Sequence, residues 1–268
     1  MKFRIAAFAD EASSSLDGQI RNMKENGVTL LEIRGVDGEN ISDISLSKAS
    51  EVRERLDEAG IGVWSLGSPY GKISLEDDFD AHLRKFEHGL KLCEVLGAKH
   101  IRLFSFYGSE GKTDEVFKRL ERFLDSSKGS GIILCHENEK GIYGEKAPKC
   151  LEIHRQFPDI RAVFDPANFI QAGQDTLKAW EMLRPFIEYM HIKDALPDGS
   201  VVPAGKGTGN LPFLLSEYDG DVVTVEPHLT VFGGLSELER EKKSRQAYAY
   251  PDQETAFKAA VDALKALI

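Results

Sequence analysis

Tyr189-Met190-His191-Ile192-Lys193-Asp194 is an apolar run that ends in three side chains able to bind a metal ion or carry a proton. A short apolar run of this kind is typical of a buried strand. Three other apolar runs end similarly, at the carboxylates Glu137, Asp165 and Glu226. From residue 137 to 165, 165 to 191 and 191 to 226 there are 28, 26 and 35 residues. Each interval suits one strand, one helix and two connections, so the pattern predicts a repeated strand-helix unit.

The rest of the chain continues this alternation, which predicts a closed parallel (β/α)8 barrel. The length of 268 residues fits two small domains or one barrel. We find no linker that would divide the chain, so we expect one barrel domain over residues 1–268. Such barrels carry their active sites at the C-terminal strand ends. The predicted strands are 3–9, 30–36, 61–66, 100–106, 132–137, 161–165, a run into the His191 cluster, and 221–226.

Composition excludes several classes of protein. A formal net charge of −10 repels phosphate backbones, so we expect no nucleic acid partner. The first apolar stretch, Ile5 to Ala9, is too tightly bracketed by charges for a signal peptide or a membrane span. Three scattered cysteines form neither a disulfide framework nor a thiolate zinc site. We therefore expect a soluble cytoplasmic protein without a membrane partner.

The four strand-end residues suggest a metal site at the mouth of the barrel. Glu137, Asp165, His191 and Glu226 offer three carboxylates and one imidazole, which is a mostly oxygen-donor set. This set suits Mn²⁺ or Mg²⁺ and accepts Co²⁺ or Zn²⁺. We expect one divalent ion, with Mn²⁺ favoured. Taken singly, each residue has an ordinary alternative role as a helix cap or a hydrogen-bonded structural group.

These residues resemble the sugar phosphate isomerases and epimerases with a xylose-isomerase-like barrel, which include ketose 3-epimerases, inosose isomerases and dehydratases, and hydroxypyruvate isomerases. The resemblance spans nearly the whole chain. Its most specific parts are Glu137-Asn138, Phe164-Asp165-Pro166-Ala167-Asn168, His191-Ile192-Lys193-Asp194, and Glu226 after the last strand. It implies that Glu137, Asp165, His191 and Glu226 hold one metal ion. It also implies that Glu137 and Glu226 act as acid and base on opposite faces of a sugar.

The chain departs from the family pattern at two positions that would touch substrate. Asn168 stands where many epimerases have a histidine, and Pro197 stands where some have an arginine. The metal site therefore transfers from the resemblance better than the substrate does. Our candidates for substrate contacts are Asn138, Asn168, Lys193, Asp194 and His228.

Several motifs leave two interpretations open. Lys193 and Asp194 are either substrate contacts or a salt-bridged pair that orients His191. The glycine-rich run Gly205 to Gly209 is either a phosphate cradle or a turn that needs positive φ. Glu32 either reaches the metal or pairs with Arg34 or Arg102. The charge run 237–245 is either a solvated helix or the edge of a lid.

The resemblance implies a metal-dependent isomerase or epimerase that acts on a small carbohydrate or polyol ketone. Proton removal next to the carbonyl would give an enediolate held by the metal, and proton return would fix the product. The alternatives are an inosose dehydratase-type lyase and a barrel that binds metal and sugar without turnover. The homologues that this resemblance suggests are often dimers or tetramers, so a homodimer or homotetramer is our expectation for assembly.

Overall fold

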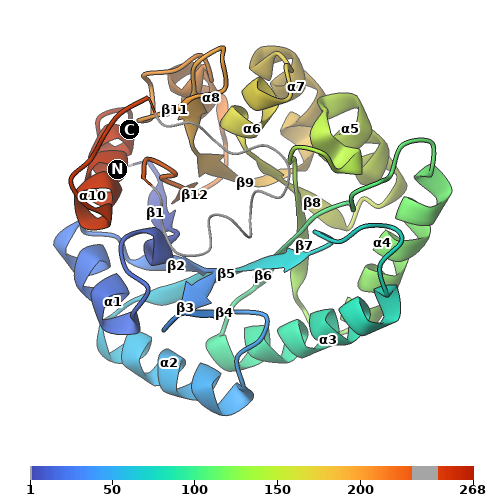
Figure 1. Cartoon of the computed structure of the whole chain (residues 1–268), viewed down its shortest axis with the longest axis horizontal. Coiled ribbons are helices and arrows are strands. Elements are labelled where there is room, and N and C mark those ends of the chain that lie inside the picture. Colours follow the sequence, from blue (N-terminus) through green and yellow to red (C-terminus); the bar gives the residue numbers. More distant parts are fainter. Residues whose placement is uncertain (1, 231–246) are drawn as a thin grey trace.

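A closed barrel of eight parallel strands forms the centre of the computed structural model, which describes residues 2–230 and 247–268 (Figure 1). Neighbouring strands follow the order β1, β12, β9, β8, β7, β6, β5, β2, and pairing of the first strand with the last closes the sheet. The predicted (β/α)8 barrel is therefore confirmed. The barrel strands are β1 Arg4–Ala7, β2 Leu30–Ile33, β5 Gly62–Tyr70, β6 His100–Leu103, β7 Ile133–Glu137, β8 Ile160–Phe164, β9 Ile187–Ile192 and β12 Val222–Val225.

Helices surround the barrel and cover its outer face (Figure 1). Among the described residues, no helix has the length and apolar character that crossing a bilayer requires. The α-helices are α1 Leu16–Glu25, α2 Leu46–Glu58, α3 Phe79–Leu96, α4 Thr113–Ser127, α5 Ala147–Gln156, α6 Pro166–Gln171, α7 Thr176–Leu183, α8 Leu211–Glu217 and α10 Gln253–Lys265. The described ranges also contain the short 3-10 helices η1 Ala9–Glu11, η2 Tyr143–Glu145 and η3 Arg184–Phe186.

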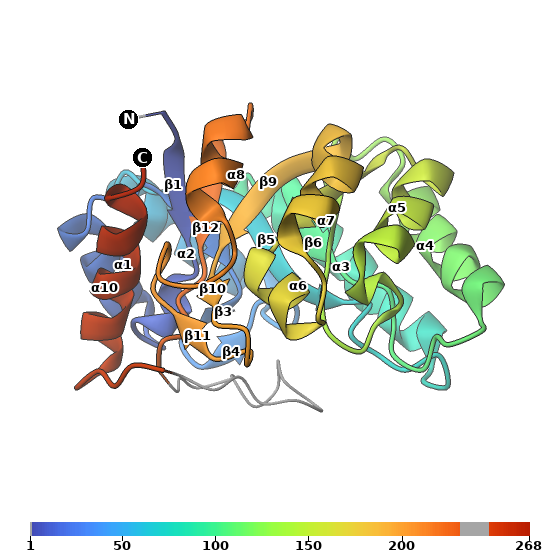
Figure 2. The same cartoon turned by 90° about the horizontal axis from the view of Figure 1, so that it is seen from above.

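Two small antiparallel ribbons follow the C-terminal ends of barrel strands. One pairs β3 Gly35–Val36 with β4 Glu39–Asn40, and the other pairs β10 Asp194–Ala195 with β11 Val201–Val202. Both ribbons lie on the same side of the molecule (Figure 2). The charge run 237–245 lies outside the described residues.

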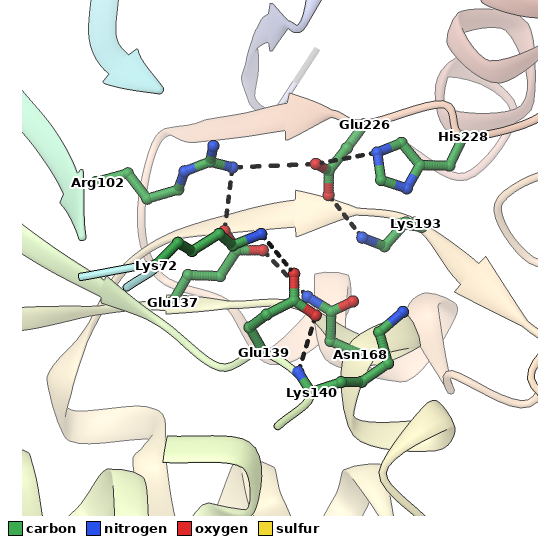
Figure 3. Close-up of a pocket in the computed structure, with 9 residues that line it drawn as sticks. All are labelled: Lys72, Arg102, Glu137, Glu139, Lys140, Asn168, Lys193, Glu226 and His228. Carbon is green, nitrogen blue, oxygen red and sulfur yellow. Dashed lines mark hydrogen bonds and ion pairs between the residues drawn. The ribbon is translucent and has the colours of Figure 1, made fainter. Parts of the chain in front are cut away.

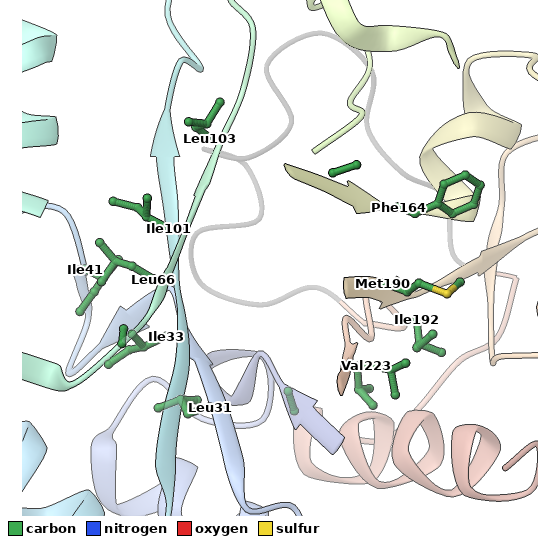
Figure 4. Close-up of a cluster of buried hydrophobic side chains, with 14 of the residues drawn as sticks. Leu31, Ile33, Ile41, Leu66, Ile101, Leu103, Phe164, Met190, Ile192 and Val223 are labelled. Carbon is green, nitrogen blue, oxygen red and sulfur yellow. The ribbon is translucent and has the colours of Figure 1, made fainter. Parts of the chain in front are cut away.

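Alternation along the strands sorts side chains between two hydrophobic clusters, because successive strand residues point to opposite faces. The larger cluster fills the space between strands and helices and includes Leu31, Ile101, Met190 and Val223 (Figure 4). The smaller one joins Cys135, Val163 and Tyr189 from three adjacent strands. Two residues beyond these three, on the same side of the chain, stand Glu137, Asp165 and His191. The barrel interior therefore changes from an apolar layer to a polar layer toward the strand ends.

Candidate metal and catalytic site

The structure brings the four predicted ligands together. Glu137 is the last residue of β7, Asp165 follows β8, His191 lies in β9 and Glu226 follows β12. All four side chains are buried, and one donor atom from each lies within 4.8 Å of the other three. Strands far apart in the sequence thus deliver a single cluster, because the closed barrel brings their C-terminal ends to one mouth.

His191 is held by a carboxylate on each side of its ring. Its Nδ1 lies 3.1 Å from Glu137 Oε1 and 3.6 Å from Glu226 Oε2, so this nitrogen faces the ligand cluster. Its Nε2 lies 3.2 Å from Glu32 Oε2, and the Tyr189 hydroxyl donates a 2.8 Å hydrogen bond to Glu32 Oε1. A carboxylate on the second ring nitrogen fixes the orientation of a metal-binding histidine.

The sequence interpretation did not identify this role of Glu32, because it left open whether the side chain reaches the metal or pairs with an arginine. Burial, the largest single influence, raises the pKa of Glu32, but attraction to His191 and Arg102 and hydrogen bonds from His191 and Tyr189 together lower it. Alternation offered a signal, since Glu32 is the polar residue between the outward-facing Leu31 and Ile33. Its contact with His191 spans 159 residues of sequence, which is why local pattern did not identify the partner.

Lys193 lies directly on the cluster. Its Nζ is 2.8 Å from Asp165 Oδ2. It also lies 2.7 Å from Glu226 Oε2 (Figure 3). Burial alone would lower the pKa of Lys193, but attraction to Asp165, Glu226 and neighbouring carboxylates raises it well above its ordinary value. The side chain is therefore an ammonium ion among the predicted metal ligands.

Two arginines contact the oxygens of Glu137 and Glu226 that do not face His191. Arg102 Nη1 lies 3.1 Å from Glu137 Oε2 and 4.0 Å from Glu226 Oε1. Arg34 Nη1 lies 3.3 Å from Glu226 Oε1, while its Nε bonds Asp10 at 2.9 Å. Burial would raise the pKa of Glu226, but attraction to Lys193 and other neighbouring groups brings it well below its ordinary value. The sequence interpretation gave neither arginine a role at the glutamates.

The two predicted asparagines have different positions. Asn138 accepts a 2.9 Å hydrogen bond from the Asp165 backbone nitrogen and donates a 3.0 Å bond to the Asp165 carbonyl, so it fixes the backbone of that ligand. Asn168 Nδ2 donates to Glu137 Oε1 at 3.2 Å. Asn168 also lines the pocket in front of the cluster (Figure 3).

Asp194 points away from Lys193 and is surrounded by backbone amides. Its Oδ2 accepts hydrogen bonds of 3.0 Å from Gly205 and Gly207, and its Oδ1 accepts 2.9 Å bonds from Gly209 and Ala195. The glycine-rich loop therefore cradles an anion, but that anion is the chain's own carboxylate. A Cβ at Gly207 would come within 2.3 Å of Asp194 Oδ1, which explains the glycine there. The hypothesis of a Lys193–Asp194 pair does not match this geometry.

His228 closes one side of the pocket. Its Nε2 lies 3.4 Å from both Glu11 Oε1 and Glu226 Oε1, and its backbone nitrogen donates to Glu11. Burial, the largest influence, lowers its pKa well below the ordinary range, so the imidazole is neutral. Its φ of +45° lies in the left-handed region.

A small polar pocket with a cavity volume of about 10 Å³ lies in front of the cluster. This volume is near the minimum that holds one water molecule and lies far below the about 300–1,000 Å³ usual for ligand sites. Basic and acidic groups alternate around it (Figure 3). Burial alone would raise the pKa of Glu139, but Lys72 (2.9 Å away), Lys140 and Lys193 lower it to about 2. The lining residues are Lys72, Arg102, Glu137, Glu139, Lys140, Asn168, Lys193, Glu226 and His228.

Two features of the cluster fit a divalent cation, namely the state of the Asp165 carboxylate and the set of donor atoms. Asp165 Oδ2 is fully buried and accepts no hydrogen bond from any described residue, although it is 2.8 Å from the Lys193 ammonium. Burial and the nearby Glu226 and Glu137 raise the pKa of Asp165 to about 7, against the attraction of Lys193. A buried aspartate this reluctant to ionise gains from a positive ion. The oxygen-rich donor set excludes a thiolate-preferring metal and agrees with Mn²⁺, Mg²⁺, Co²⁺ or Zn²⁺.

Comparison with known proteins gives the same fold and several related activities. A 3-dehydroshikimate dehydratase from Bacillus anthracis is 22% identical over 206 residues, which cover 70% of this chain and 72% of that protein. The IolI protein with a bound zinc atom superimposes with a TM-score of 0.75 at 17% identity, covering 99% of this chain and 98% of that one. A D-psicose 3-epimerase studied with D-fructose gives 0.74 at 16% identity, covering 98% and 97%.

The two solved structures share the barrel with this chain, and the two enzyme names, a dehydratase and an epimerase, give different reactions. At these identities the structural matches establish the fold alone. The family model described as xylose isomerase-like TIM barrel matches residues 20–265, which is most of the sequence. This chain therefore belongs to the xylose isomerase-like TIM barrel family.

Proposed function

We propose that this protein is a divalent-metal-dependent isomerase or epimerase of a small sugar or polyol ketone. The observation that carries the proposal is the placement of Glu137 and Glu226. Both line the pocket, and each directs one oxygen toward His191 and the other toward Arg102. Two carboxylates on one pocket can remove a proton at one face of a substrate and return it at another.

The chain's own residues would divide the work as follows. A divalent ion held by Glu137, Asp165, His191 and Glu226 would attract substrate oxygens and stabilise the negative charge that develops on them. Glu226, whose carboxyl is kept ionised by neighbouring positive and hydrogen-bonding groups, would remove the proton next to the carbonyl. Glu137 would deliver a proton to the resulting enediolate. Arg102 would hold both carboxylates in place through Nη1.

Proton exchange with solvent tests the proposal. The protein, loaded with Mn²⁺, is incubated in D₂O with ketoses, ketose phosphates and inososes, and NMR follows deuterium at each carbon. We expect exchange and conversion for at least one compound. Glu137→Gln and Glu226→Gln should each lower conversion by about two to four orders of magnitude, the usual effect of removing a positioned acid or base. Glu181→Gln, at an exposed carboxylate on α7, is the matched control.

The other outcomes discriminate between the alternatives. Wild-type conversion rates in both glutamine variants would refute the two-glutamate mechanism. Unchanged activity in excess chelator would refute the dependence of the reaction on a metal ion. A protein that binds metal but exchanges no proton in any compound is a binding barrel.

One comparison favours a dehydratase as the second candidate. A curated protein that is 22% identical to this chain over 206 residues is named 3-dehydroshikimate dehydratase. Elimination of water also begins with removal of a proton next to a carbonyl, so the same glutamates would serve. Formation of an unsaturated product that absorbs ultraviolet light, in place of an epimer, would assign the chain to this class.

A further inference from the structure

The position of Lys193 on the ligand cluster distinguishes it from the other basic residues of the site. Asp165 Oδ1 accepts the Asn168 backbone amide, which leaves Oδ2 for the cluster, and Lys193 is 2.8 Å from that Oδ2. Glu226 Oε2 faces His191 Nδ1, and Lys193 is 2.7 Å from that Oε2. Lys193 therefore forms ion pairs with the oxygens of two predicted ligands that face the cluster, which we call the inward oxygens.

The arginines contact the other oxygen of each glutamate, which does not face His191 and which we call the outward oxygen. Arg34 and Arg102 approach Glu226 through Oε1, and Arg102 approaches Glu137 through Oε2. Both guanidinium groups can stay in place while the inward oxygens bind a metal ion. Lys193 cannot, because an ammonium within 2.8 Å of two oxygens and a divalent ion about 2.0–2.2 Å from the same oxygens would repel each other at close range.

We infer that Lys193 is a built-in counter-cation that occupies the metal site and must leave it before a divalent ion binds. The inference rests on the metal site of the proposed function and goes beyond it. The Lys193 ammonium neutralises part of the charge of Glu137, Asp165 and Glu226, so the fold tolerates three buried carboxylates without metal. Metal uptake is then an exchange of the Lys193 ammonium for a divalent ion. The metal affinity is therefore the difference between the attraction of the carboxylates for the metal ion and their attraction for the ammonium.

The displaced ammonium has a place to go. Lys193 lines the pocket together with Glu139, whose carboxylate lies 2.9 Å from Lys72 and already experiences the Lys193 charge. Rotation of the Lys193 side chain toward Glu139 would keep the ammonium paired. It would also place a positive group where substrate oxygens enter. Metal binding would thus prepare the substrate pocket through the same residue that it displaces.

Calorimetric titration of the metal-free protein with Mn²⁺ tests the exchange without any substrate. Lys193→Met keeps an unbranched side chain that is one atom shorter and removes its charge. We expect the Kd for Mn²⁺ to fall about tenfold or more, the scale on which groups next to ligands change metal affinity. Lys72→Met is the matched control, because its ammonium bonds Glu139 and no predicted ligand, and its Kd should change far less.

Thermal unfolding provides the second readout. Metal-free Lys193→Met should melt below the metal-free wild type, and saturating Mn²⁺ should raise its melting temperature by more than it raises that of the wild type. Lys193→Gln, also uncharged, should behave in the same direction. An equal or weaker Mn²⁺ affinity in both variants, or failure of both to fold in Mn²⁺, would overturn the inference. Proton exchange does not enter these measurements, so tight Mn²⁺ binding by a protein without turnover would refute the proposed reaction and leave the cation exchange standing.

Discussion

Asp165 combines a structural role with a predicted role as a metal ligand. It is the N-cap of α6, where its Oδ1 accepts a 2.8 Å hydrogen bond from the Asn168 backbone nitrogen, and Pro166 occupies the first helical position. Its Oδ2 faces Lys193 and the other ligands. A helix cap and a ligand can coincide because a carboxylate has two oxygens that point to different sides. Replacing this residue therefore removes two separable interactions.

Asparagine and alanine at position 165 should separate them. Both Asp165→Asn and Asp165→Ala should lose most of the metal affinity, because neither supplies a charged oxygen. Asparagine caps helices as well as aspartate does, whereas alanine costs about 1 kcal/mol of stability. In chelator, Asp165→Ala should melt a few degrees below Asp165→Asn, as measured by circular dichroism. Equal melting temperatures would show that the cap contributes nothing here.

The strand ends could be predicted because apolar runs stop where ligands begin, and side chains alternate along each strand. Element lengths were harder. The strand predicted at 61–66 continues to Tyr70 in β5, past Gly67, where a Cβ would lie 2.6 Å from the Phe8 ring. Glycine there permits close packing inside the barrel, although in sequence it signals a break.

The junction of β5 and α3 depends on a neutral histidine. His82 Nε2 accepts a 2.8 Å hydrogen bond from the Gly71 backbone nitrogen just after β5. Burial, followed by repulsion from Lys85 and Arg119, lowers the pKa of His82 to about 4. The depressed pKa means that this histidine contributes stability above the unfolded value of about 6.5, and that this contribution is lost as pH falls toward 4.

His82→Gln should make unfolding less sensitive to acid. Glutamine keeps an acceptor for Gly71 but takes up no proton. Between pH 7.5 and 4.5 the wild type should lose about 2 to 3 kcal/mol more unfolding free energy than the variant, from the linkage between pKa and stability. Denaturant unfolding of both proteins at the two pH values, in chelator to exclude metal effects, measures this difference. Parallel losses in the two proteins would exclude His82 as the acid-sensitive group.

At the scale of the whole molecule, barrel closure creates the site. Pairing of β1 with β12 brings Arg34, near the start of the chain, to Glu226, near its end, across 192 residues. No local pattern in the sequence contains this contact, and the same holds for Arg102 and Glu137. The ligand set could be predicted because every strand end converges on one mouth. The basic partners could not, because they depend on register around the closed sheet.

The last helix packs against the barrel, and Phe257 is its largest fully buried side chain. Phe257 in α10 is 1% exposed, so Phe257→Ala should leave a cavity and cost about 3–5 kcal/mol of unfolding free energy. Phe213→Ala, at a side chain of α8 that is 50% exposed, should stay within about 0.5 kcal/mol of the wild type. Denaturant unfolding measures both. A loss of under about 1 kcal/mol at Phe257 would mean that the barrel holds together without a firmly packed last helix.

The hydrogen bonds that Asp194 accepts from the amides of Gly205, Gly207 and Gly209 have a consequence for engineering. Residues 196–210 sit at the rim of the mouth, where a designer would exchange loops to change substrate preference. Three backbone amides of this segment donate hydrogen bonds to Asp194. Asp194 directly follows Lys193 and stands three positions after His191. A transplanted loop that lacks these three amides would leave a buried carboxylate without donors. It would also loosen the strand that carries the imidazole. The rim and the reactive centre of this barrel can therefore be redesigned only as one unit.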